Sequence, residues 1–132
     1  LVHEVHGTIR TSHCMSCGGE WPTSAFLDRV RAGEADPPCA DCGGIVKPAV
    51  VFFGQPIPQG ALSASMAAAD ACDVLLAAGT TLGVGPINSM VTRAKRFGAS
   101  VVILNDSPTE MDKHADLIVR GDLQQVLPQI IG

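Results

Sequence analysis

The chain has 132 residues, of which 46% are hydrophobic and 17% charged, and its net charge is −4 at neutral pH. This suits one globular domain with a real core, and the acidic balance argues against nucleic-acid binding, which needs a basic surface. No apolar run approaches the ~18 residues of a membrane span and no signal segment opens the chain, so we expect no membrane partner and a cytoplasmic, reducing location. Oligomeric state is left open.

The first segment, Leu1 to Val5, has the composition of a strand, and we expect residues 1–7 to be extended and to end at Gly7. Because the chain begins at Leu1 rather than Met, we expect it to be a piece of a larger protein. His6 closes this segment. A histidine can act as a general base near neutral pH, but one beside a glycine is more often structural. Surface or capping roles are predicted for the other three histidines, His3, His13 and His114.

Cysteine spacing is the strongest chemical signal. Four cysteines form two C-x-x-C pairs: Cys14, Cys17, Cys39 and Cys42. Two such turns complete a closed tetrahedral site, as a structural zinc ion needs. The alternatives are two disulfides, which need an oxidising compartment, or a redox pair. We therefore predict a small zinc-ribbon module over about residues 8–47, with His13 as a minor rival ligand.

Between the two pairs, residues 18–38 must loop out, and we expect a small helix there that ends at Gly33. Its apolar residues are Trp21, Phe26, Leu27 and Val30. Beyond the module, the run Val50 to Phe53 predicts a short strand stopped by Gly54, and residues 60–71 predict an Ala-rich helix. Cys72 is expected to be a small buried thiol.

The remaining residues, 48–132, predict a Rossmann-like half. Residues 74–78 are apolar without alternation, as in a parallel strand buried on both faces. A helix that starts at Pro86 and stops at Gly98 follows, then strands at 101–104 and 117–119 and a last helix opened by Asp122 in a capping-box-like start. Counted from Val50, the order β-α-β-α-β-β-α predicts an α/β fold with a partial, twisted parallel sheet.

Two loops of this half suggest ligand binding. Gly79, Gly83 and Gly85 lie where a strand turns into a helix, and backbone amides at such a turn can face the phosphates of a dinucleotide. A tight turn that binds nothing explains them equally well, since the G-x-G-x-x-G pattern is absent. Asn105 follows the next strand, where an amide can bond a ribose or adenine, and an ordinary Asn-Asp turn is the alternative.

Five motifs occur in one order along the chain: Glu4-Val5-His6-Gly7, the two cysteine pairs, Lys47-Pro48-Ala49-Val50-Val51-Phe52-Phe53-Gly54, Ala78-Gly79-Thr80-Thr81-Leu82 and Val101-Val102-Ile103-Leu104-Asn105. Taken together they resemble the sirtuins, NAD-dependent protein-lysine deacylases, over essentially all 132 residues. The resemblance implies transfer of an acyl group from lysine to ADP-ribose with release of nicotinamide, a structural Zn²⁺, NAD as cofactor and an acyl-lysine protein or peptide as partner.

The same resemblance implies roles for individual residues. His6 would be the catalytic base that helps a ribose hydroxyl attack. The acyl-lysine cleft would be lined by Val51, Phe53 and Gly54, where the peptide pairs as an added strand. The NAD contacts would be Gly79, Thr80, Thr81, Asn105 and the backbone near Leu123. The four cysteines would hold the zinc.

Some features depart from the family pattern. Gln55 stands where the family more often has Glu, and Thr81 replaces the commoner Ser with its hydroxyl kept. A first glycine-rich turn and a Gln-Asn-Ile-Asp segment, which the family carries upstream of the histidine, do not occur in these 132 residues. We therefore expect the C-terminal part of such an enzyme. The alternatives are a non-catalytic zinc-ribbon and half-Rossmann interaction module, or a different NAD- or FAD-binding enzyme, which the ordered motifs disfavour.

Overall fold

The computed structural model describes residues 1–131 and divides into two units, Leu1–Ala61 (unit 1) and Leu62–Gly132 (unit 2). Helix α2 (Gln59–Ala71) begins before the boundary and ends after it, which confirms the helix predicted over residues 60–71. None of the helices in the described part of the chain is long and apolar enough to cross a membrane. The two units are built on different kinds of sheet, so each is described by itself.

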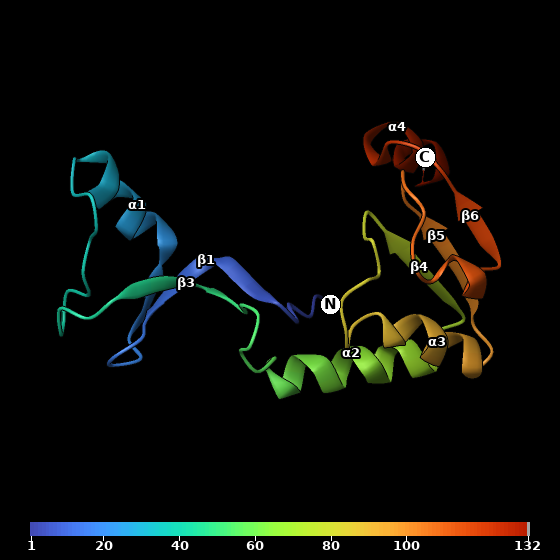
Figure 1. Ribbon diagram of the computed structural model, residues 1–132, viewed down its shortest axis with the longest axis horizontal. Helices are drawn as coiled ribbons and strands as arrows, with labels where there is room; N and C mark the ends of the chain where they lie inside the picture. Colours follow the sequence, from blue (N-terminus) through green and yellow to red (C-terminus); the bar gives the residue numbers. More distant parts are fainter. Residues whose placement is uncertain (132) are drawn as a thin grey trace. The chain divides into compact units, whose positions relative to one another are not determined.

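Unit 1 is a three-stranded antiparallel sheet with one helix. The strand order is β2-β1-β3, from β1 (Gly7–Cys14), β2 (Glu20–Pro22) and β3 (Val46–Val50), and β1 and β3 run side by side in Figure 1. Helix α1 (Thr23–Arg31) follows β2 and gives way to Gly33, whose φ is +100°. This confirms the predicted insert helix and its stop.

Two predictions for unit 1 are wrong. Residues 1–6 form no strand, because the Gly7 N–H turns back to the Glu4 carbonyl at 3.0 Å and β1 only begins at Gly7. The strand expected at Val50 to Phe53 lies earlier, since β3 ends at Val50. β3 also pairs antiparallel with β1 rather than joining the parallel sheet. Strand β2 was not predicted.

Unit 2 holds the parallel sheet. Its order is β4-β5-β6, with β4 (Val74–Ala78), β5 (Ser100–Leu104) and β6 (Leu117–Val119) in register. Besides the sheet and part of α2, unit 2 contains helix α3 (Ser89–Arg96), the 3-10 turn η1 (Asp112–His114) and helix α4 (Leu123–Ile131). The three predicted strands of this unit are confirmed.

Helix ends in unit 2 match the sequence in part. The Asp122 side chain accepts the Gln124 N–H at 2.8 Å, so the predicted opening of the last helix is confirmed. Gly98, with φ +97°, follows the end of α3 as expected. The predicted start at Pro86 is three residues too early, because a turn precedes Ser89.

The core of unit 2 lies between the sheet and α3. It is a cluster of five buried side chains: Ala77, Leu82, Val91, Val101 and Ile103. Only one face of β4 takes part, because alternate residues of a strand face opposite sides. On the other face Val74 and Leu76 are 59% and 48% exposed, so the prediction of a strand buried on both faces is wrong. Cys72 is half-buried rather than buried.

Candidate functional site

The two C-x-x-C knuckles of unit 1 are built in the same way. Cys14 is the last residue of β1, and the Gly18 N–H donates back to its carbonyl at 3.0 Å. In the second knuckle the Gly43 N–H donates to the Cys39 carbonyl at 2.9 Å. Both glycines have φ +72°, a conformation that costs glycine little. Each turn therefore returns on itself tightly enough to present two sulfurs to one point.

The four sulfur atoms form one cluster. They all lie within 4.8 Å of one another, with 3.5 Å between Cys14 and Cys42 and 3.7 Å between Cys17 and Cys39. A tetrahedron with zinc–sulfur bonds of about 2.3 Å has edges of about 3.8 Å, whereas a disulfide is about 2.05 Å. All four thiols are free. The cluster has the donor set and size of a closed zinc site, and His13 is not part of it.

The thiols of the cluster differ in pKa. The pKa of Cys14 is lowered to about 6, mainly because the Cys17 backbone N–H donates to its sulfur. The pKa of Cys42 is raised to about 12: the Gly44 N–H lowers it, but the other three thiols together raise it more. One thiol thus ionises readily and further ionisation is opposed. A divalent cation at the centre removes that opposition, because four thiolates then surround a positive charge.

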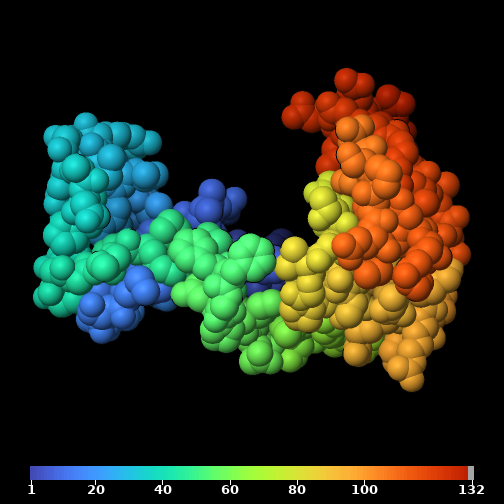
Figure 2. Space-filling model, in the orientation of Figure 1, coloured from blue at the N-terminus to red at the C-terminus, as the bar shows by residue number. Residues whose placement is uncertain are grey.

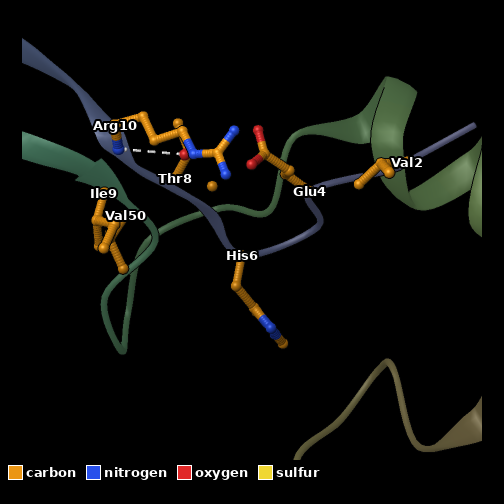
Figure 3. Close-up of a pocket in the computed structure, with 8 residues that line it drawn as sticks. Val2, Glu4, His6, Thr8, Ile9, Arg10 and Val50 are labelled. Atoms are coloured by element: carbon orange, nitrogen blue, oxygen red, sulfur yellow. Dashed lines mark hydrogen bonds between the residues drawn. The ribbon is translucent and has the colours of Figure 1, made fainter. Parts of the chain in front are cut away.

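His6 stands at the entrance to β1. Its neighbour Gly7 has φ +75°, and a Cβ there would lie 1.9 Å from the Ala49 carbonyl oxygen, so only glycine fits. The imidazole is exposed and borders an open pocket of about 840 Å³. In Figure 3 the Glu4 carboxylate and the Arg10 guanidinium face each other, while His6 points away from both. Its ring is therefore open to solvent.

The segment predicted to line the acyl-lysine cleft follows β3. The Val51 N–H donates to the His6 carbonyl at 2.9 Å, which ties this segment to the histidine. A turn comes next: the Gln55 N–H donates to the Phe52 carbonyl at 2.9 Å, and Gly54 has φ +83°. Phe53 is 96% exposed at its tip. Figure 2 shows this part of unit 1, in green, on the surface.

In unit 2 the predicted NAD residues gather at the carboxyl edge of the sheet. Gly79 follows β4, and its N–H donates to the Leu104 carbonyl at the end of β5 at 2.9 Å. A Cβ on Gly79 would lie 2.5 Å from Leu123 Cδ1, so these two residues are in close approach. Asn105 follows β5, and its N–H donates to the Val119 carbonyl at 3.1 Å. The structure thus brings Gly79, Asn105 and Leu123 to one edge.

Two predicted side chains have local hydrogen bonds of their own. The Thr80 hydroxyl accepts the Leu82 N–H at 3.2 Å, and the Asn105 side-chain amide donates to the Ser107 carbonyl at 2.8 Å. Thr81, the residue after Thr80, is exposed. By contrast, a Cβ at Gly83 or Gly85 would meet no atom closer than 3.7 Å. The backbone of the glycine-rich turn is therefore open to approach.

Residues that sequence reasoning missed support both regions. The Arg120 guanidinium donates to the carbonyls of Asn105 and Ser107 at 3.2 Å and pairs with Asp112. Leu82 takes a left-handed φ of +53° in the glycine-rich turn. In unit 1, Lys47 is buried within β3. Lys47 and Leu82 each stand in one of the five ordered motifs, but the sequence predicted no role for either.

A parallel α/β sheet with a glycine-rich turn after its first strand, together with a four-cysteine cluster, defines the class of this protein as a Rossmann-like α/β fold that carries a metal-binding type of module. The family model described as "Sir2 family" matches residues 1–86, which is more than half of the chain. The chain belongs to the Sir2 family, as the five ordered motifs indicated.

Two curated relatives and one solved structure illustrate the similarity. NAD-dependent protein deacetylase 2 of Streptomyces coelicolor and NAD-dependent protein deacetylase 1 of Pyrobaculum aerophilum are each 40% identical over 130 residues. These alignments cover 98% of this chain but 54% and 50% of the relatives. The structure of Sir2Af2 bound to a myristoylated histone peptide matches with a TM-score of 0.88 and 36% identity, over 97% of this chain and 54% of that one. The chain spans about half the length of the curated relatives it matches.

Proposed function

We propose that this chain is the C-terminal part of an NAD-dependent protein-lysine deacylase, with His6 as the general base. Support comes from the family membership and from the names of the matched relatives, which are NAD-dependent deacetylases. The acyl-lysine peptide would lie along Val51, Phe53 and Gly54 as an added strand. A peptide of the acylated kind is bound in the Sir2Af2 structure.

The observation that carries this proposal is the hydrogen bond of 2.9 Å from the Val51 N–H to the His6 carbonyl. It fixes the first residue of the proposed peptide-binding segment against the backbone of the proposed base. His6 is held on its other side by Gly7, where no other residue fits. An exposed imidazole beside an exposed segment is the arrangement that a bound acyl-lysine requires, since base and substrate must meet.

Each part of the chain has a distinct task in this reaction. When bound, NAD supplies the ribose hydroxyl that accepts the acyl group and a nicotinamide that leaves. The proposed NAD contacts are Gly79, Thr80, Thr81, Asn105 and Leu123. A ring nitrogen of His6 accepts the proton of the attacking hydroxyl, and the Val51–Gly54 segment orients the acyl-lysine. Cys14, Cys17, Cys39 and Cys42 would hold a Zn²⁺ whose role would be structural, because four protein ligands would leave no open position.

The remaining assignments are part of the same proposal. We assign a zinc-binding module to about residues 8–47 and a Rossmann-like half to about 48–132. A cytoplasmic location is supported by five free cysteines, since thiols stay reduced there. No nucleic acid or membrane is proposed as a partner. A non-catalytic interaction module receives no support from the names of the relatives.

The test is His6→Ala in the complete natural protein, with acyl-lysine turnover and nicotinamide exchange measured side by side. Deacylation should fall by about 10²- to 10⁴-fold, the usual contribution of a general base, while NAD binding and some exchange persist. His114→Ala, which alters a histidine in the η1 turn, is the matched control and should keep full turnover. A folded His6→Ala protein that deacylates at the normal rate would remove His6 from the mechanism.

A further inference from the structure

One charged side chain of unit 1 is buried and has no part in the proposed chemistry. Lys47 lies in β3, opposite His13 of β1, and is only 9% exposed. A buried ammonium is costly unless polar groups surround it. The groups that surround the Lys47 ammonium therefore show which part of the chain it stabilises.

The ammonium of Lys47 contacts the backbone that leads into the proposed peptide-binding segment. Its Nζ donates to the Val50 carbonyl at 2.7 Å and to the Pro48 carbonyl at 3.0 Å. The pairing between β1 and β3 shifts register between Gly7 and Ser12, so the regular ladder is interrupted in this stretch. Lys47 binds carbonyl groups where the sheet is irregular.

The same ammonium also holds the turn that follows. It lies 4.4 Å from the centroid of the Phe52 ring, within the range of a cation–π contact. The Phe52 N–H in turn donates to the Gln55 side-chain oxygen at 3.0 Å. One cation thus restrains the segment at Val50 and at Phe52, on either side of the Val51 that bonds to His6.

We propose that Lys47 is a positioning residue for the acylated peptide: it sets the conformation of the Val51–Gly54 segment against His6. This rests on the proposed function and goes beyond it, because it assigns peptide recognition to a side chain that the peptide does not touch. A segment restrained in advance loses less conformational entropy on binding, so its affinity for the peptide is higher.

Lys47→Met removes the donors but keeps a side chain of similar length. Replacing a buried charge by an apolar side chain is often tolerated, and Pro48 is an exposed residue, so its carbonyl can bond to water instead. The fold and the zinc content should therefore persist, while the segment loosens. Lys47→Arg, which keeps a cation, should restore part of the effect. Lys113→Met, at an exposed lysine of η1, is the matched control.

In the complete natural protein, we expect Lys47→Met to raise KM for an acetyl-lysine peptide about tenfold, as for loss of a charged hydrogen bond, with KM for NAD unchanged. Amide hydrogen exchange at Val51 and Phe52, measured without substrate, should accelerate. Exchange that matches the wild type, or an equal loss of zinc, NAD affinity and peptide affinity, would overturn the proposal.

A second variant and the exchange measurement each test the proposal independently of Lys47→Met turnover. If Lys47→Met does not fold, Phe52→Leu removes the ring contact alone, and peptide KM should still rise; an unchanged KM would count against the positioning role. The exchange measurement also separates this proposal from the proposed function, since it needs no turnover. A protein without deacylase activity whose Val51 amide still depends on Lys47 would refute the enzyme assignment while leaving the restraint of the segment established.

Discussion

The two units differ in the types of side chain that they bury. In Leu1–Ala61, all of which the structure describes, the buried side chains are two cysteines, a serine and a lysine: Cys14, Cys39, Ser12 and Lys47. In the described part of unit 2 the buried side chains are all apolar: Ala69, Ala77, Leu82, Val91, Ala94, Ala99, Val101, Ile103 and Leu104. Hydrophobic burial is available to stabilise unit 2, whereas unit 1 lacks a comparable apolar core.

This contrast explains why the cysteines lie where they do. A unit of about 60 residues rarely gains enough from a hydrophobic core alone and usually needs a metal or disulfides. In unit 1 the buried sulfurs of Cys14, the last residue of β1, and of Cys39, in the loop before β3, take the place that apolar side chains have in unit 2. Arg29 adds to this, because it pairs with Glu34 and donates to the carbonyl of Pro38 beside Cys39 at 2.7 Å. The two units should therefore fail under different treatments.

The largest expected effect is loss of unit 1 on metal removal. Chelation, or Cys39→Ser, should abolish slow amide exchange throughout β1 and β3, because metal binding and folding are coupled in such modules. Slow exchange at Val101 and Ile103 of β5 should remain. Hydrogen exchange followed peptide by peptide, with zinc measured by elemental analysis, makes the comparison.

Cys72→Ser is the control for that experiment, since its sulfur lies outside the cluster and donates to the Ala69 carbonyl. It should keep its zinc and both patterns of slow exchange. Unit 1 amides that stay protected in a protein shown to be free of metal would mean that the apolar contacts of unit 1 suffice.

The next effect in size is a cavity in unit 2. Ile103 is fully buried, and Ile103→Ala should cost roughly 2–5 kcal/mol of unfolding free energy, from lost burial and the space left behind. Urea denaturation monitored at β5 measures it. The same substitution at Ile9 of β1, which is 74% exposed, should change stability by less than about 0.5 kcal/mol. Equal costs at the two positions, or zinc lost from Ile103→Ala, would erase the contrast between the units.

The sequence predicts unit 2 better than unit 1, for the same physical reason. Continuous apolar runs mark β4, β5 and β6 directly, and side chains of β4 and β5 pack into the core. In unit 1 the apolar run Val50 to Phe53 misplaces β3, whose residues include Lys47 and Pro48. There the strand is defined by its pairing with β1 and by the turn at Gly54, and neither is visible in local composition.

The candidate site shows the same limit. Cysteine spacing alone predicts a cluster that the structure confirms, because two short knuckles fix their own geometry. Glycines after a strand likewise indicate an open turn. The Arg120 contacts depend on carbonyls 15 and 13 residues earlier, which only the folded chain brings within reach, whereas Lys47 binds the neighbouring Pro48 and Val50 carbonyls through the local conformation of β3. Residue types alone do not show which carbonyls a cation binds, so the supporting contacts of both regions had to come from the structure.

The smallest expected effect is the loss of stability at low pH. In unit 2 it depends on the protonation of a carboxylate, Asp116, and in unit 1 on the protonation of thiolates. The pKa of Asp116 is held below its ordinary value, first by Lys95 and also by the Val101 N–H, which donates to Asp116 Oδ2 at 2.8 Å. Because the unfolded chain binds this proton more readily, ionised Asp116 favours the folded state at neutral pH. That contribution is present above the unfolded pKa of about 3.9 and is lost as pH falls through the lower folded value.

Asp116→Asn cannot ionise, so its unit 2 should be slightly less stable than wild type at pH 6, and the two proteins should converge as pH falls from about 4 through the lower folded pKa of Asp116. Amide exchange of β5 peptides from pH 3 to 6 measures the difference without interference from unit 1, where protons compete with the metal for thiolates. Zinc release against pH should be the same in both proteins. Asp36→Asn, an exposed carboxylate of unit 1, serves as the control and should leave the β5 curve unchanged. If wild type and Asp116→Asn instead differ by a constant amount at every pH, the bond to Val101 acts through geometry alone, and acid would not distinguish the two units through this carboxylate.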